Sequence, residues 1–176
     1  MKLNLREIIE IPGGSVPFAQ ELDTVLLDFP SVRAYTAPIT AEGKVVNTAG
    51  ILTLQGKLHA EMLCVCDRCG AEFPRTVDLD LHADITADAQ DDDPEVFTLD
   101  GDWLDVDEVL STCFILSMDT KCLCRPDCAG LCDRCGANLN LGPCRCQKPR
   151  DPRMAVLEQL LDNKTDEEEE AAHNSD

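Results

Sequence analysis

The same six residues, Cys-Asp-Arg-Cys-Gly-Ala, occur at positions 66–71 and again at 132–137. Two cysteines separated by two residues and followed by glycine are typical of a turn in which both thiolates converge on a soft metal ion. The glycine accepts the backbone bend that such a turn requires. Five further cysteines lie around the second copy: Cys122, Cys124, Cys128, Cys144 and Cys146. This pattern predicts structural metal sites, with zinc as the expected ion.

A closed zinc site takes four protein ligands, so the cysteines can be divided in more than one way. One arrangement joins the two repeated pairs in a single ribbon-like site, and leaves a second quartet with awkward spacing: Cys124, Cys128, Cys144 and Cys146. The other arrangement forms two groups: Cys66, Cys69, Cys124 and Cys128, then Cys132, Cys135, Cys144 and Cys146. We favour the second arrangement because it keeps the distal site local in the sequence. A single site is the third alternative.

The choice of metal and the character of the site follow from the ligands. Four thiolates can also hold iron or an iron–sulfur cluster, but the iron–sulfur spacings C-x₂-C-x₂-C and C-x₄-C-x₂-C do not occur here. An all-cysteine site has no open position for water, which argues against metal catalysis. Of the remaining cysteines, Cys113 is expected to fill the core on a helix, Cys64 to be structural or a reserve ligand, and Cys122 has no assigned role.

Composition places the chain among cytoplasmic globular proteins. Its 176 residues suit one domain with a small appendage, and aromatic residues make up only 4%. The first residues contain no long apolar run, and no segment reaches the roughly 20 apolar residues of a membrane helix. Eleven cysteines in a reducing compartment are expected to bind metal rather than form disulfides.

Charge is distributed unevenly along the chain. The net charge is −19, yet residues 121–150 carry six basic and two acidic residues, a local charge of +4. Residues 88–108 and the tail 162–176 carry −10 and −6. The chain as a whole therefore repels nucleic acid, while the cysteine-rich segment could contact phosphate. The candidate contacts with RNA or a partner are Arg125, Arg134, Arg145, Lys148 and Arg150. The alternative is that these residues form an ordinary solvated surface.

Apolar periodicity predicts an α+β fold. Residues 2–11 suggest a strand, 15–30 are ambiguous, and 31–87 read as antiparallel strands, with a short turn between 35–40 and 43–47. Residues 50–63 and 73–85 alternate and flank the first cysteine turn, which predicts a hairpin with one buried face. Residues 88–102 are expected to be a loop, and 105–117 a helix with Val106, Val109, Leu110, Cys113 and Phe114 on one stripe.

The predicted organisation has four parts. Residues 1–120 form an antiparallel β-rich domain that includes the helix, and 121–150 form the zinc-binding segment. That segment is too rich in Cys, Gly and Pro to build its own core, so metal must organise it. Residues 151–162 form a short C-terminal helix, and 163–176 form a disordered acidic tail.

Several segments are similar to the bacterial and plastid YceD proteins, also called large ribosomal RNA subunit accumulation proteins. The resemblance runs from Lys2 to about Leu161. It rests on Leu3-Asn4-Leu5-Arg6, on Cys66-Asp67-Arg68-Cys69 followed by Phe73, on Leu104-Asp105-Val106, and on Asp151-Pro152-Arg153. Its most specific part is Leu123-Cys124, Asp127-Cys128, Gly130-Leu131-Cys132, Cys135-Gly136-Ala137-Asn138-Leu139-Asn140 and Cys144-Arg145-Cys146. The sequence departs from the family pattern at Asp119 and Cys122, so Cys122 is not expected to be a shared ligand.

The resemblance implies a non-enzymatic role in ribosome biogenesis, in processing or accumulation of large-subunit ribosomal RNA. The expected partners are pre-ribosomal RNA, a large-subunit ribosomal protein, or both, with neither a membrane nor a small-molecule substrate. Two other functions fit the cysteines: a zinc/thiol redox switch and a transcription-associated zinc ribbon. A redox switch requires exposed thiols of low pKa, which a thiol titration of the folded protein detects.

Overall fold

A computed structural model of the chain describes residues 1–86 and 96–146. The elements are β1 (Lys2–Asn4), α1 (Arg6–Ile9), β2 (Ser15–Leu22), the 3₁₀ turn η1 (Thr24–Leu26), β3 (Val32–Tyr35), β4 (Ile39–Thr48), β5 (Ile51–Val65), β6 (Glu72–Thr86), β7 (Val96–Thr98), β8 (Trp103–Asp105), α2 (Val106–Ser117) and the 3₁₀ turn η2 (Leu139–Leu141). Within these residues the strands form a six-stranded and a two-stranded sheet, accompanied by two α-helices. The predicted α+β class is confirmed.

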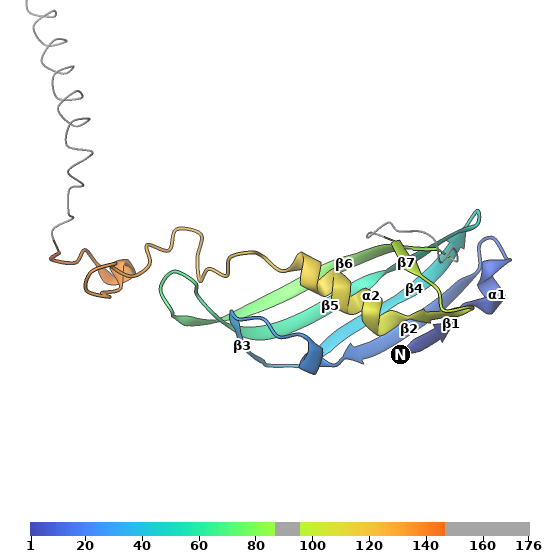
Figure 1. Cartoon of the computed structure of the whole chain (residues 1–176), viewed down its shortest axis with the longest axis horizontal. Coiled ribbons are helices and arrows are strands. Elements are labelled where there is room, and N and C mark those ends of the chain that lie inside the picture. The colour runs from blue at the N-terminus through green and yellow to red at the C-terminus, as the bar shows by residue number, and fades with distance from the viewer. Residues whose placement is uncertain (87–95, 147–176) are drawn as a thin grey trace, which may run out of the picture. The chain divides into compact units, whose positions relative to one another are not determined.

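The larger sheet is built on the long hairpin of β5 and β6. Its strand order is β2-β4-β5-β6-β7, and β3 pairs with the far end of β5 (Figure 1). Every pairing is antiparallel except that of β6 with β7. Because side chains alternate along a strand, β5 directs one set of residues into the core: Leu52, Leu54, Leu58, Ala60, Met62 and Cys64. The predicted hairpin with one buried face is confirmed.

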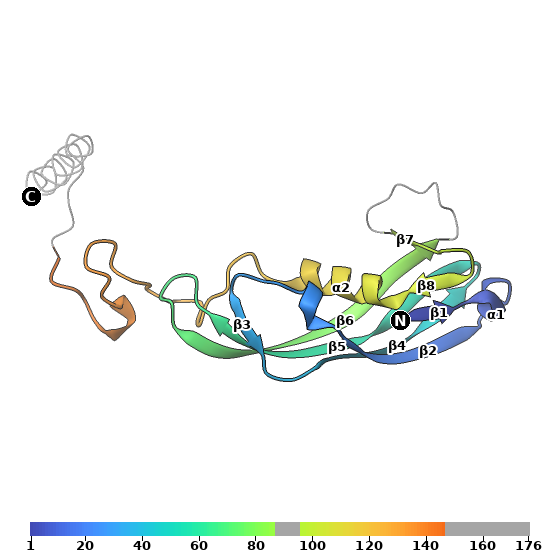
Figure 2. The same ribbon diagram turned by 60° about the horizontal axis from the view of Figure 1, so that its bottom comes forward.

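Helix α2 covers the inner face of the sheet (Figure 2). Asp105 caps its first turn, because the Asp105 carboxylate accepts a hydrogen bond of 3.1 Å from the Asp107 amide. The stripe predicted for this helix is buried at Val106, Val109, Leu110 and Phe114, whereas Cys113 is only partly buried. The Phe114 ring also meets Phe29 edge to face, with ring centroids 5.9 Å apart. The predicted helix over 105–117 is confirmed, beginning one residue later.

The N-terminal strand prediction is mostly wrong. Only Lys2–Asn4 is a strand, and Arg6–Ile9 forms the short helix α1. Tertiary contacts decide this segment, because Leu5 and Ile8 are buried while Asn47 Nδ2 donates hydrogen bonds to the carbonyls of Ile8 and Ile9. Four residues make only about one helical turn, which is too short for a repeating pattern of apolar residues to appear in the sequence.

Strand β4 runs without interruption through the turn predicted between residues 40 and 43. Gly43 lies directly opposite Gly56 on β5, and a Cβ built on Gly43 would stand 2.3 Å from the Gln55 carbonyl oxygen. The two glycines therefore permit a close approach of neighbouring strands. The turn lies instead at Ala49 and Gly50, which both have positive φ, as a two-residue hairpin requires.

The predicted loop over 88–102 is described only from residue 96 onward. That part contains β7 and a bridge between Asp100 and Trp103, so it is not all loop. The predicted C-terminal helix and acidic tail lie outside the described residues. No helix in the described ranges combines the length and the apolar character that crossing a bilayer requires.

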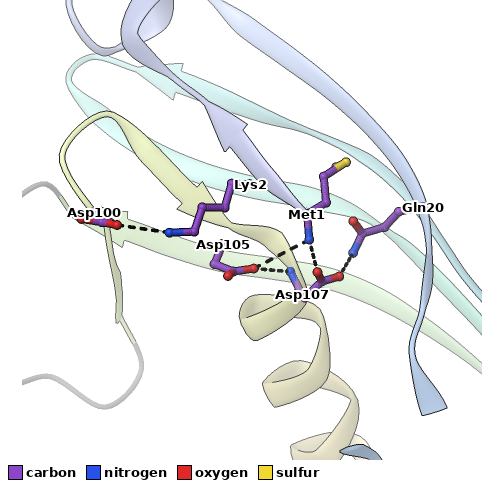
Figure 3. A network of polar contacts seen from close by, with 6 residues as sticks. All are labelled: Met1, Lys2, Gln20, Asp100, Asp105 and Asp107. Carbon is purple, nitrogen blue, oxygen red and sulfur yellow. Dashed lines mark hydrogen bonds and ion pairs between the residues drawn. The ribbon is translucent and has the colours of Figure 1, made fainter. Parts of the chain in front are cut away.

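A polar network joins β1, β2 and the start of α2 (Figure 3). Asp107 receives hydrogen bonds from the Met1 amino group and from Gln20 Nε2, the latter at 2.7 Å. Lys2 Nζ lies 3.2 Å from the Asp100 carboxylate. The Gln20–Asp107 hydrogen bond joins β2 of the large sheet to the first turn of α2, and the Met1–Asp107 contact joins the N-terminus beside β1 to the same turn.

By its internal contacts the chain divides into two compact units. The first spans Met1–Gly130 and the second begins at Leu131. Residues Cys122, Cys124 and Cys128 therefore belong to the same unit as the sheet and α2. Each unit contains one group of four cysteines.

Candidate metal centres

The first cysteine group lies where the β5–β6 hairpin meets the chain that follows α2. Cys66 and Cys69 come from the hairpin turn, and Cys124 and Cys128 come from the later segment. The four sulfurs lie within 4.8 Å of one another. Cys66 Sγ is 3.8 Å from Cys128 Sγ, and Cys69 Sγ is 3.7 Å from Cys124 Sγ. Phe73 and Leu123 pack against this group, which is largely shielded from solvent.

The second group belongs entirely to the second unit. Cys132, Cys135, Cys144 and Cys146 also have sulfurs within 4.8 Å of one another, and Cys132 Sγ lies 3.4 Å from Cys144 Sγ. The η2 turn connects the two pairs, and the Asn138 side chain caps it by accepting a hydrogen bond from the Asn140 amide. Cys135 is exposed, so this group is more open than the first.

The repeated hexapeptide folds into the same turn twice. In the first copy the Cys66 amide donates to the Ala71 carbonyl at 2.9 Å, and the Gly70 amide donates to the Cys66 carbonyl at 2.8 Å. In the second copy the corresponding distances, from Cys132 to Ala137 and from Gly136 to Cys132, are 2.8 and 2.9 Å. The two glycines have φ values of 68° and 69°, a region that glycine enters without steric cost. Repetition in the sequence thus encodes two equivalent pairs of ligands.

The sulfur spacing fits a tetrahedral metal ion. Four sulfurs at about 2.3 Å from a central zinc lie about 3.8 Å from each other, because the edge of a tetrahedron is about 1.6 times its centre-to-corner distance. The three sulfur pairs given above lie 3.4–3.8 Å apart. A disulfide bond is far shorter, about 2.05 Å, and none of the eleven cysteines, all within the described residues, forms one. Both groups could therefore hold a metal ion, in the grouping that we favoured from the sequence.

Thiol ionisation differs within each group. Burial alone would raise the pKa of Cys66, but hydrogen bonds from the backbone of Cys124, Cys69 and Arg68 lower it to about 6. Backbone hydrogen bonds from Cys135 and Arg134 lower the pKa of Cys132 to about 7. In each group, one thiolate therefore forms readily near neutral pH.

One thiol in each group, Cys124 in the first and Cys146 in the second, resists ionisation. Burial, followed by hydrogen bonds with Cys66 and Cys69, raises the pKa of Cys124 to about 12. A hydrogen bond with Cys135, together with burial, raises the pKa of Cys146 to about 12. Several negative sulfurs at this spacing repel each other, and a bound divalent ion removes that repulsion. The electrostatics of both groups thus favour a cation at the centre.

Hydrogen bonds also tie the later segment to the first turn. The Asp67 amide donates to the Cys122 carbonyl at 2.8 Å, and the Cys122 amide donates to the Asp67 carboxylate at 2.6 Å. Arg68 Nη1 donates to the Cys128 carbonyl at 2.9 Å. Sequence reasoning missed the roles of Asp67 and Arg68, because residues between paired cysteines read as spacers. Their recurrence in both copies was the available signal.

The remaining cysteines lie outside both groups. Cys64 and Cys122 are buried beside each other, and burial followed by the hydrogen bond to Cys122 raises the pKa of Cys64 to about 11. Arg75 on β6 reaches this pair, with Nη1 4.0 Å from Cys122 Sγ and Nη2 2.5 Å from the Asp119 carboxylate. Cys113 packs partly against the core, and burial raises the pKa of its thiol. Arg75 is a further residue that the sequence did not single out.

The predicted basic contacts are only partly described. Arg125, Arg134 and Arg145 are exposed, and Arg125 lies 3.5 Å from Asp127. Arg125 belongs to the first unit, while Arg134 and Arg145 belong to the second. Lys148 and Arg150 lie outside the described residues.

Comparison with known proteins places the chain in a family. Residues 54–161 match the family described as large ribosomal RNA subunit accumulation protein YceD, and this span includes all eight grouped cysteines. The chain belongs to the YceD family. The resemblance found in the sequence is thereby confirmed.

Curated relatives are distant. Uncharacterized proteins of Mycobacterium bovis and Mycobacterium tuberculosis are 28% identical over 122 residues, which cover 66% of this chain and 58% of theirs. The large ribosomal RNA subunit accumulation protein YCED homolog 1, chloroplastic, of Zea mays is 24% identical over 147 residues, covering 65% of this chain and 50% of the maize protein. The chain thus spans little more than half the length of these relatives. No solved structure matches it.

Proposed function

We propose that this YceD-family protein is a non-enzymatic, cytoplasmic ribosome-biogenesis factor that supports processing and accumulation of large-subunit ribosomal RNA. In this proposal, zinc ions held by the two cysteine groups order the segment after α2 into a docking surface. The surface binds ribosomal RNA or a large-subunit ribosomal protein. The observation that carries the proposal is that the family match spans both cysteine groups.

Zinc is the ion that the donor set favours. Four thiolates in tetrahedral spacing are typical of structural zinc, and no protein position is left open for water. The four sulfurs of each group would be the ligands, and the bound ion would supply folding free energy to its turn. The groups therefore support an architectural role rather than a catalytic one.

The charge of a filled site limits how RNA could be bound. Four thiolates and one divalent ion carry a formal charge of −2, so two filled sites carry −4. Cys66 and Cys69 lie outside residues 121–150, but Asp67 and Arg68 between them sum to zero, so the −4 cancels the +4 of residues 66–69 and 121–150 taken together. Non-specific attraction to phosphate is therefore weak, and recognition would depend on individual guanidinium groups such as Arg134 and Arg145. Arginine suits this role because its planar fork contacts two phosphate oxygens at once.

The test compares two charge reversals of equal size in cells that lack the native copy. Arg134→Glu with Arg145→Glu alters the second unit, whereas Lys44→Glu with Lys57→Glu alters the outer face of the sheet. Association with large-subunit precursor particles is followed by sedimentation and crosslinking, and precursor ribosomal RNA by gel analysis.

We expect only the arginine variant to lose its association with the precursor particles, and only cells with that variant to accumulate unprocessed ribosomal RNA. The molecule crosslinked to the native chain then identifies the partner as RNA or protein. If RNA is contacted directly, removing both arginines reduces the slope of the logarithm of the binding constant against the logarithm of the salt concentration by about two. Absence of the native protein from every large-subunit precursor contradicts the proposal.

A further inference from the structure

Strand β6 has an open edge along most of its length. On one side it pairs with β5 from Glu72 to Ile85, but on the other side β7 pairs only with Asp84–Thr86 (Figure 1). Within the described ranges, no other strand and no further backbone hydrogen bond meets β6 between Glu72 and Ala83. An edge of this length is a template onto which another extended chain can add.

The direction of the free backbone groups follows from the contact with the β7 segment. The Leu99 amide donates to the Thr86 carbonyl at 3.1 Å, so the backbone groups of Thr86 point to the β7 side. Successive residues of a strand direct these groups to alternate edges. The N–H and C=O groups of Thr76, Asp78, Asp80 and His82 therefore point to the open edge, and those of Val77 and Leu79 point to β5.

The core-facing side chains of β6 become less buried with distance from β7. The core-facing side chains near β7 are buried, with exposed fractions of 4% for Leu81, 4% for Ala83 and 5% for Ile85. Further along the strand, Val77 and Leu79 face the same side but are only partly buried. A strand added in line with β7 would cover these two side chains, so the open edge has an apolar side as well as free hydrogen-bonding groups.

The opposite side of the edge is acidic. Asp78, Asp80 and Asp84 point outward from β6, together with His82. Asp78 already contacts His59 Nδ1 at 2.6 Å, whereas Asp80 forms no ion pair with any described residue. A second copy of β6 placed against this edge would bring carboxylates against carboxylates, which disfavours self-pairing.

We propose that the open edge of β6 binds an extended protein segment in which apolar residues alternate with Lys or Arg. Such a segment would complete the backbone hydrogen bonds of Thr76, Asp78, Asp80 and His82. Its apolar side chains would cover Val77 and Leu79, and its basic side chains would meet Asp80. This inference adds a binding surface to the proposed function and does not depend on it.

The test uses the purified full chain and a synthetic peptide of eight residues that alternates Lys and Val. Amide hydrogen exchange is measured residue by residue by NMR. In the free protein, the amides of Thr76, Asp78, Asp80 and His82 should exchange rapidly, while those of Val77 and Leu79 should be protected. Saturating peptide should slow exchange of the first set at least about tenfold, as expected for a completed strand pairing.

Two pairs of variants separate backbone pairing from charge. Thr76→Pro removes an edge N–H without breaking the ladder to β5 and should weaken binding about tenfold, whereas Thr76→Val, which keeps that N–H, should change it less than about twofold. Asp80→Lys should weaken binding of the Lys–Val peptide and strengthen binding of a Glu–Val peptide, each relative to the native chain. Glu42→Lys, on the same outer face but on β4, should leave both affinities unchanged.

Three results would overturn the inference. They are protection of the edge amides in the free protein, binding of the peptide without protection of those amides, and equal effects of the two Thr76 variants. Concentration-dependent dimerisation that protects the same amides would assign the edge to a second copy instead. Because no ribosomal component is present, none of these results bears on the proposed role in RNA accumulation.

Discussion

Two double cysteine variants distinguish the two possible groupings of the cysteine ligands, because each grouping predicts a different number of bound zinc ions for each variant. In the grouping seen in the structure, Cys66 and Cys128 share one site, and Cys135 belongs to the other. Cys66→Ser with Cys128→Ser should therefore leave one tightly bound zinc per chain. Cys66→Ser with Cys135→Ser should damage both sites. If the two repeated pairs shared a site, these two outcomes would be exchanged.

The size of the effect follows from the number of ligands. A structural zinc site contributes about 10–16 kcal/mol in small zinc-binding peptides, so one of four similar ligands accounts for about 3 kcal/mol. Loss of one ligand, as at each site of the cross-site variant, lowers the affinity about 100-fold, and loss of two ligands from one site lowers it about 10,000-fold. A chelator of intermediate strength should then remove zinc from damaged sites and leave intact sites filled.

Metal is measured by elemental analysis after dialysis against such a chelator, and released zinc is followed with a chromophore. The native chain should retain two ions, the same-site variant one, and the cross-site variant none. Cys113→Ser, outside both groups, should retain two. A single retained ion in the cross-site variant would refute the grouping, and a metal-free native protein with an ordered second unit would refute metal binding itself.

Three further predictions concern the sheet. Gly56→Ala should destabilise the fold by about 2–3 kcal/mol in urea unfolding, because its Cβ would lie 2.3 Å from the Glu42 carbonyl oxygen; unchanged stability would contradict the close strand approach. Asn47→Leu should cost about 3 kcal/mol, because buried Asn47 donates to the Ile8 and Ile9 carbonyls and accepts from the Gly50 amide. Hydrogen bonding to Asp78 raises the pKa of His59. The stabilisation that protonated His59 provides is therefore fully present below pH 6.5, and it is lost as the pH rises through the folded-state pKa of His59. Asp78→Asn should return that pKa toward 6.5 in an NMR titration.

The cysteine sites were predictable because their signal is local. A hexapeptide with two cysteines and a glycine specifies its own turn, and the turn brings two sulfurs together whatever surrounds it. The long alternation of β5 and β6 and the stripe of α2 are equally local. The grouping followed from the proximity of the second site's four cysteines in the sequence, which leaves Cys124 and Cys128 to complete the first site.

Features that depend on contacts between distant parts of the chain could not be predicted from the sequence. Gly43 reads as a turn residue until its register opposite Gly56 is known, because only that register requires the absence of two side chains. The short helix α1 is set by buried Leu5 and Ile8 and by the Asn47 amide, which lies 38 residues away from Ile9. Arg75 appears as an ordinary polar residue of a strand, and its contacts with Cys122 and Asp119 arise only in the folded chain.

The two cysteine groups differ in what else supports them, and this difference bears on the proposed function. The first group is joined to the sheet by the hydrogen bonds of Asp67 and Arg68 and by the packing of Phe73 and Leu123. The described part of the second unit contains no buried residue other than Cys132, and its elements are one turn, one bridge and η2. Metal loss should therefore weaken the first site but unfold residues 131–146, because this described part of the second unit has no apolar core to supply folding free energy in place of the metal. A factor that docks through Arg134 and Arg145 would then lose its partner at metal concentrations that leave the sheet intact.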